Sequence, residues 1–112
     1  QQYFYIIFVE KNILNLKKRC MNEELVRKLI ELAKKYNVTK LVQFGSSLSS
    51  FDECSDIDFA CDGLYDKNFF KFGAELEELF NKPVDLIPMQ PPNKFLDYIL
   101  EKGKVIYEAT NN

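Results

Sequence analysis

The chain of 112 residues has room for one domain, and its 46% apolar and 29% charged content is ordinary for a globular protein. A net charge of −2 argues against bulk nucleic-acid binding, and no apolar run approaches the roughly 20 residues that span a bilayer. Histidine is absent, which excludes Ser-His-Asp and Cys-His catalysis and zinc sites with imidazole ligands.

The first twenty residues differ in pattern from the rest of the chain. The apolar run from Tyr3 to Val9 precedes a basic cluster, which is the reverse of a secretory signal. Met21, followed by Asn22 and two glutamates, looks like a natural start. We therefore expect residues 1–20 to be an N-terminal extension or an expression remnant, with an added strand as the functional alternative. Residues 21–112 are then the folded domain.

The segment from Asn22 to Cys61 predicts a helix followed by two strands. Asn22 can cap a helix over 23–36, in which Leu25, Leu29 and Leu32 recur at helical spacing. "KLVQF", residues 40–44, predicts a buried strand that Gly45 ends. A polar loop with room for a short helical turn leads to a second strand, 56–61.

The remaining chain predicts two helices that alternate with two strands. A helix over 66–80 is followed by "PVDLIP", a strand over 83–88 bounded by prolines. A third helix, 93–102, is expected to pack through Phe95, Leu96, Ile99 and Leu100, and "KVIYE", 104–108, closes the chain as a strand. This order predicts an α/β (α+β) fold, a mixed β-sheet with helices packed against it.

Paired carboxylates mark the second strand. Side chains alternate along a strand, so Asp56 and Asp58 share one face while Ile57 and Phe59 take the other. Two carboxylates this close repel each other unless a cation lies between them, and magnesium prefers such oxygen ligands. A lone Asp-x-Asp at a strand end is more often a solvated edge, so this pair alone does not establish a site.

A glycine-serine turn and a third aspartate strengthen the pattern. Gly45 lets a phosphate approach the backbone, and the Ser46 hydroxyl and successive amides can bind an anion. Asp85 stands in a short apolar strand, where an unpaired carboxylate is costly. If that strand lies beside 56–61, Asp85 joins the same metal site and can accept the proton of an attacking hydroxyl.

The segments Phe44-Gly45-Ser46, Ser55-Asp56-Ile57-Asp58 and Val84-Asp85-Leu86 resemble the minimal nucleotidyltransferase domain of the DNA polymerase beta superfamily, over residues 21–108. The resemblance implies a polymerase-beta-like nucleotidyltransferase fold. It implies that Gly45 and Ser46 bind the ATP triphosphate and that the catalytic residues Asp56, Asp58 and Asp85 bind two Mg²⁺ ions. It also implies that Asp85 is the catalytic base. Proteins this small are similar to the antitoxins of HEPN-domain ribonuclease toxins, which implies AMP transfer to a tyrosine of a partner toxin.

One departure from the family leaves alternatives open. Many relatives carry an arginine soon after the Gly-Ser turn, whereas Ser47, Leu48, Ser49 and Ser50 stand here, so a bidentate phosphate clamp is missing. Lys40 or Lys67 could compensate. A non-catalytic antitoxin that neutralises by binding is therefore the alternative to the enzyme. A small-molecule or antibiotic nucleotidyltransferase is a weaker one, because little chain remains to build an acceptor pocket.

Three cysteines, Cys20, Cys54 and Cys61, lack metal-site spacing and are expected to be reduced, which favours a cytoplasmic location. Neither a membrane nor a nucleic acid is expected as a direct partner, and a homo- or hetero-oligomer is compatible with the sequence.

Overall fold

The computed structural model describes residues 21–109, so the expectation for residues 1–20 lies outside the described part. Its helices are α2 (Glu23–Lys35), α3 (Asp66–Phe80) and α4 (Lys94–Lys102), and its strands are β1 (Lys40–Phe44), β2 (Ile57–Asp62), β3 (Val84–Pro88) and β4 (Lys104–Glu108). A short 3-10 helix, η1 (Gly45–Leu48), follows β1. The predicted order of elements is confirmed. Among residues 21–109, no helix combines the length and apolar character needed to cross a membrane.

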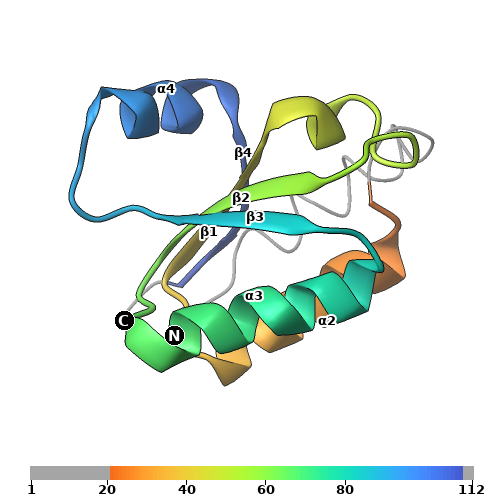
Figure 1. Ribbon diagram of the computed structural model, residues 1–112, viewed down its shortest axis with the longest axis horizontal. Coiled ribbons are helices and arrows are strands. Elements are labelled where there is room, and N and C mark those ends of the chain that lie inside the picture. The colour runs from red at the N-terminus through yellow and green to blue at the C-terminus, as the bar shows by residue number, and fades with distance from the viewer. Residues whose placement is uncertain (1–20, 110–112) are drawn as a thin grey trace.

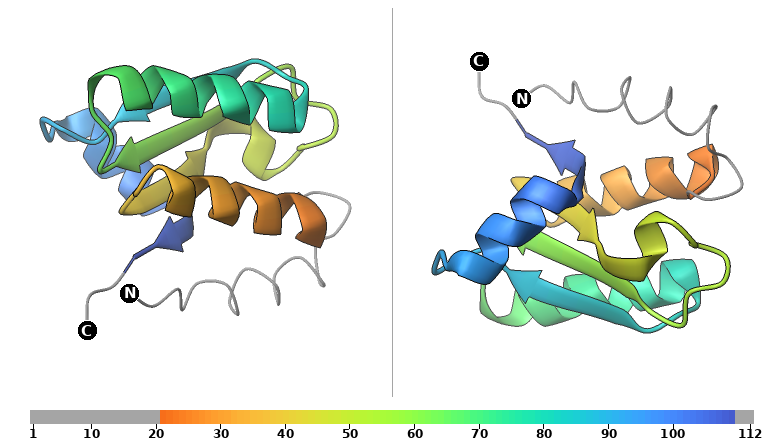
Figure 2. Two further views of the ribbon diagram at one scale, coloured as in Figure 1. Left: turned by 90° about the horizontal axis from the view of Figure 1, so that it is seen from below. Right: turned by 90° about the horizontal axis from the view of Figure 1, so that it is seen from above.

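The four strands form one mixed sheet in the order β3-β2-β1-β4. β1 is antiparallel to both β2 and β4, whereas β2 and β3 are parallel and are connected through α3. Helices α2 and α3 lie side by side on one face of the sheet, and α4 and η1 lie on the other (Figures 1 and 2). The predicted α+β fold, a mixed sheet with helices packed against it, is therefore confirmed.

The sheet separates two apolar clusters. Ile57 and Phe59 of β2 point into the larger cluster, beneath α2 and α3, while Ala60 points into the smaller one beneath α4. Helix α4 contributes Leu96 and Ile99 to this smaller cluster, as expected from their spacing. The prediction that Phe95 and Leu100 also pack inward is wrong, since their side chains are 57% and 43% exposed. Helix α4 therefore presents apolar side chains on two sides.

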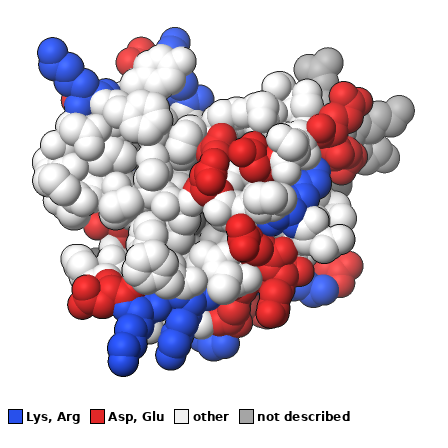
Figure 3. All heavy atoms as spheres, in the orientation of Figure 1, with Lys and Arg blue, Asp and Glu red and all other residues white. Residues whose placement is uncertain are grey.

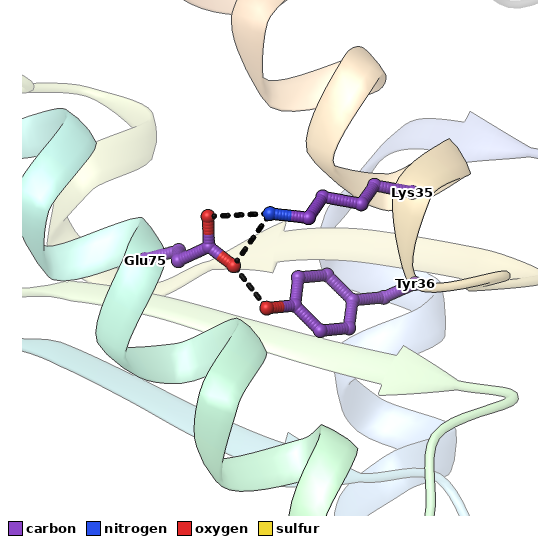
Figure 4. A network of polar contacts seen from close by, with 3 residues as sticks. All are labelled: Lys35, Tyr36 and Glu75. Carbon is purple, nitrogen blue, oxygen red and sulfur yellow. Dashed lines mark hydrogen bonds and ion pairs between the residues drawn. The ribbon is translucent and has the colours of Figure 1, made fainter.

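Polar contacts join α2 to α3 on the face of the sheet opposite to the one that carries Asp58 and Asp85 (Figure 4). The Lys35 ammonium donates hydrogen bonds to both carboxylate oxygens of Glu75, at 3.1 and 3.3 Å, and the Tyr36 hydroxyl donates to the same carboxylate. The hydrogen bond from Tyr36, followed by that from Lys35, lowers the pKa of Glu75. The Tyr36 ring also meets Phe72 edge to face at 5.7 Å. These contacts fix the helix layer that supports the sheet from below.

The cap of α2 gives a test of this local structure. The Asn22 side chain accepts a hydrogen bond from the backbone N–H of Leu25 at 2.8 Å, which satisfies one unpaired donor of the first turn. We expect Asn22→Ala to lower the free energy of unfolding by about 1 kcal/mol, whereas Asn22→Ser, which retains an acceptor, should cost much less. Urea unfolding followed by circular dichroism measures both. Equal losses in the two variants would contradict a capping role.

Candidate active site

The strand register brings the predicted acids to one place. Asp58 lies opposite Asp85 in the parallel β2–β3 pair and opposite Phe44 in the antiparallel β1–β2 pair. Asp58 and Asp85 alternate with core residues that point toward α2 and α3, so both carboxylates lie on the face that carries α4 and η1. Strand β2 begins at Ile57, one residue later than expected, and Asp56 directly precedes it. Acidic side chains gather over β2 and β3 on this face (Figure 3).

The carboxylates of Asp56, Asp58 and Asp85 can be brought to a shared point. Each residue offers one oxygen, and these three oxygens all lie within 4.8 Å of one another. Asp56 and Asp58 are half-buried and Asp85 is exposed. Hard divalent cations such as Mg²⁺ are bound by carboxylate oxygens, with water and substrate phosphate completing the coordination. The donor set therefore fits a magnesium site that remains open toward solvent.

The raised pKa of Asp58 also fits a cation site. Burial, the negative charge of Asp56 and a hydrogen bond with Asp85, in that order, raise the pKa of Asp58 from an ordinary 3.8 to about 6. In the absence of a cation, ionising Asp58 is therefore costlier in the folded chain than in the unfolded chain. A bound cation would remove this cost, which is typical of residues kept for binding rather than for stability.

This shift predicts that removing the charge of Asp58 stabilises the metal-free protein, and that the stabilisation depends on pH. Because the pKa of Asp58 is raised in the folded state, its stabilising effect is present below pH 3.8 and is lost as the pH rises through about 6. We expect Asp58→Asn to raise the melting temperature of the metal-free protein by a few degrees at pH 7.5, and less at pH 4. Calorimetry in the presence of a chelator measures the difference from the unmodified chain.

The matched control for this prediction is Asp52→Asn, which removes the charge of an exposed acid in the loop before β2. The control should leave the melting temperature nearly unchanged at both pH values. A gain of the same size for the two variants would show that net charge, rather than the acidic cluster, is responsible.

The Gly45-Ser46 turn lies against the acids. Gly45 adopts φ +81°, a left-handed conformation that favours glycine, and a Cβ built there would collide with Oδ2 of Asp58 and lie 3.3 Å from its Cγ. The turn starts η1, and Ser46, the residue after Gly45, is exposed. The structure thus places together all five residues that the sequence singled out: Gly45, Ser46, Asp56, Asp58 and Asp85.

Sequence reasoning missed the side chains that hold this turn and the loop before β2. Gln43 and Ser47 are both buried, and the Gln43 amide Nε2 donates to the Ser47 hydroxyl at 2.8 Å, which anchors η1 to β1. Lys82 Nζ donates to the backbone carbonyl of Phe51 at 2.6 Å and lies 5.1 Å from the centroid of its ring. A glutamine inside an apolar strand was the one available signal, since burial of a polar side chain requires a partner.

The two lysines that could compensate for the missing arginine lie at the opposite end of the sheet from the acidic cluster. Lys40 begins β1, pairs in register with Asp62 at the end of β2, and lies 3.7 Å from Glu108. Lys67 is in the first turn of α3, which follows that same end of β2. Neither lysine replaces the missing arginine. Asp62 shares the face of Asp58 but is four residues further along β2, and it does not contribute to the raised pKa of Asp58.

An open groove adjoins Asp85 on the outer edge of the sheet. It has a volume of about 380 Å³ and is lined by Phe69, Phe70, Gly73, Ala74 and Glu77 of α3 and by Val84, Asp85 and Leu86 of β3. Strand β3 is the edge strand, so the groove opens at the side of the molecule rather than inside it.

Comparison with known proteins identifies one family model, described as polymerase beta nucleotidyltransferase, which matches residues 27–112. No curated protein matches the chain.

Solved structures give the same fold. A complex of a tri-AMPylated Shewanella oneidensis HEPN toxin with an MNT antitoxin contains a chain with a TM-score of 0.61 and 20% identity, covering 80% of this chain and 74% of that one. The toxin-antitoxin MntA-HepT gives a TM-score of 0.60 at 19% identity, covering 79% and 74%. A toxin-antitoxin with AMP-PNP gives 0.63 at 21%, covering 76% and 74%. At these identities the likeness shows a shared fold.

Proposed function

The chain belongs to the polymerase beta nucleotidyltransferase family, and from that premise we propose that it transfers AMP from ATP to a hydroxyl group of a partner protein. The observation that supports this most directly is the cluster of Asp56, Asp58 and Asp85, whose oxygens lie within 4.8 Å of one another beside the Gly45-Ser46 turn. The arrangement has little structural purpose, since burial, followed by the charge of Asp56 and the hydrogen bond with Asp85, raises the pKa of Asp58 and makes its ionisation costly without a cation.

The proposed cofactor is Mg²⁺, as two ions held by Asp56, Asp58 and Asp85. When bound, the ions would neutralise phosphate charge and favour ionisation of the acceptor hydroxyl. Asp85 accepts the proton of that hydroxyl, because it is the exposed member of the cluster and the chain has no histidine for this role. The acceptor oxygen forms a bond to the α-phosphorus, the bond to the β-phosphate breaks, and pyrophosphate leaves.

The Gly45-Ser46 turn is proposed to hold the triphosphate. The absence of a Cβ at Gly45 allows close approach to the backbone beside Asp58, and the Ser46 hydroxyl can donate to a phosphate oxygen. Gln43, through its hydrogen bond to Ser47, acts as a positioning residue for this turn.

The proposed acceptor is a tyrosine of a HEPN-type toxin, for which this chain is the antitoxin. Support comes from the shared fold with chains of complexes between HEPN toxins and MNT antitoxins, one of which contains a tri-AMPylated toxin. The groove between α3 and β3 also favours a protein acceptor, because it is open at the sheet edge beside Asp85 and could admit an extended segment.

A second candidate is an antitoxin that binds nucleotide and neutralises its partner without catalysis. The observation that favours it is the missing arginine after the Gly-Ser turn, for which neither Lys40 nor Lys67 substitutes. Loss of a bidentate phosphate contact weakens nucleotide positioning but leaves the metal-binding carboxylates in place.

The two candidates differ in one assay. The chain is incubated with Mg²⁺, α-labelled ATP and a HEPN-type protein, to be sought first in the reading frame next to its own. The enzyme transfers label covalently to the partner and releases pyrophosphate. The binding-only antitoxin leaves the partner unlabelled while still neutralising it, and that outcome would overturn the proposal of catalysis.

A further inference from the structure

An aromatic pair lies directly beside the acidic cluster. Phe44 is the cross-strand neighbour of Asp58, so the two side chains lie on the same face of the sheet, and Phe44 immediately precedes Gly45. Directly opposed residues of neighbouring strands have Cβ atoms only about 4.5–5.5 Å apart. The half-buried Phe44 ring therefore borders the place where the carboxylates and the phosphate-binding turn meet.

The second member of the pair is Phe95, in the first turn of α4. Its ring meets Phe44 edge to face, with centroids 6.1 Å apart and an interplanar angle of 88°. An edge-to-face contact covers at most one face of either ring, and the Phe95 side chain is 57% exposed. At least one face of an apolar ring is thus left toward solvent. Leu96 and Ile99 are the residues of α4 that pack into the smaller apolar cluster, so core packing does not require Phe95.

We propose that Phe95 is the platform on which the base of the bound nucleotide stacks, an inference that rests on the proposed nucleotide-binding function. Asp85, Asp58 and Phe44 follow one another on neighbouring strands of this face of the sheet, and Phe95 of α4 contacts the Phe44 ring. The phosphates lie over Asp58 and the Gly45 turn, the acceptor enters on the side of Asp85, and the ribose and base extend toward α4. In Figure 3 much of the surface between the acidic side chains and α4 is white, with charged side chains projecting at the top of the view.

The physical basis is the stacking of a base on an aromatic face. Such stacking depends on the π-face that every nucleobase has, so the platform holds the base without selecting among bases. It contributes affinity only when the ligand carries a base. Removing the Phe95 ring should therefore weaken the binding of ATP and of GTP to a similar extent, and should leave the binding of inorganic triphosphate unchanged.

The test is isothermal titration of the full chain, in the presence of Mg²⁺, with ATP and with inorganic triphosphate. We expect Phe95→Ala to weaken ATP affinity about 5- to 20-fold and triphosphate affinity by less than about twofold, on the scale known for single stacked bases. Phe95→Tyr, which retains the ring, should bind both ligands normally. The matched control is Tyr65→Ala, which removes a 68% exposed aromatic residue just before α3, outside the proposed site, and should change neither affinity.

The other outcomes are distinguishable. Equal ATP affinity in Phe95→Ala and the unmodified chain would overturn the platform while leaving the proposed function intact. An equal loss of affinity for ATP and for triphosphate would also overturn the platform, because the substitution would then act on the phosphate site. If Phe95→Ala binds ATP normally but loses its protein partner, α4 is a protein-docking surface instead. Failure of the unmodified chain to bind either ligand would overturn both the platform and the proposed function.

Discussion

Replacing Asp85 by alanine is expected to abolish AMP transfer, with a fall in rate of roughly 10³-fold or more. The substitution removes one of three clustered carboxylates and the proposed proton acceptor together, and no histidine exists in the chain to replace it. Asp85 is exposed, so the fold should tolerate the change. Release of pyrophosphate in the presence of the HEPN-type partner measures the rate.

The control for this variant is Asp62→Ala, which removes an acid from the same face of the sheet at its other end. That variant should transfer AMP at nearly the unmodified rate. Association of Asp85→Ala with the partner should survive, because protein interfaces spread over about 20–30 residues on each side. Full transfer by Asp85→Ala would contradict its role as base and metal ligand.

Gly45→Ala is expected to lower both stability and ATP affinity. An alanine at φ +81° costs about 1–2 kcal/mol by itself, and its Cβ would collide with Oδ2 of Asp58. Either the turn or the Asp58 carboxylate must move, so phosphate and metal binding are disturbed together. We expect a melting temperature lower by several degrees and ATP binding weakened about 10-fold or more, measured by calorimetry.

Gly73→Ala provides the comparison within the same chain. Gly73 is inside α3, and a Cβ there would meet only Cδ2 of Leu86 at 3.8 Å, an ordinary contact. Because alanine is the better helix former, this variant should be neutral or more stable by about 0.5–1 kcal/mol, with ATP affinity unchanged. If Gly45→Ala behaves like Gly73→Ala, close approach of the turn to Asp58 has no functional importance.

The spacing of apolar residues, together with the glycine, proline and capping residues that end helices and strands, was enough to predict the order of the elements. Helix α3 begins and ends where its apolar spacing indicated, and Asn22 caps α2 as expected. Asn93, expected as the first residue of the third helix, instead caps α4, which begins at Lys94. The main error concerns α4, where Phe95 and Leu100 are exposed. A helix of nine residues has several apolar positions near one stripe, and the sequence does not state which of them the small second cluster can cover.

The candidate site was predictable in part. Alternation along a strand placed Asp56 and Asp58 together, and the cost of an unpaired carboxylate inside an apolar strand singled out Asp85. The resemblance to the nucleotidyltransferase family, now confirmed, assigned roles to these residues. The proximity of Phe44 to Asp58 depends on cross-strand register, which a single sequence does not give. The link between Lys82 and the loop carbonyl of Phe51 joins residues 31 positions apart, and only the folded chain reveals it.

The central claim is that this chain covalently modifies its partner, and intact mass spectrometry of the partner tests it most directly. The HEPN-type protein is incubated with this chain, ATP and Mg²⁺, and its mass is measured before and after. We predict a gain of one or more AMP groups, absent when Asp85→Ala replaces the unmodified chain or when Mg²⁺ is chelated. An unmodified partner that is nonetheless fully neutralised would contradict the account.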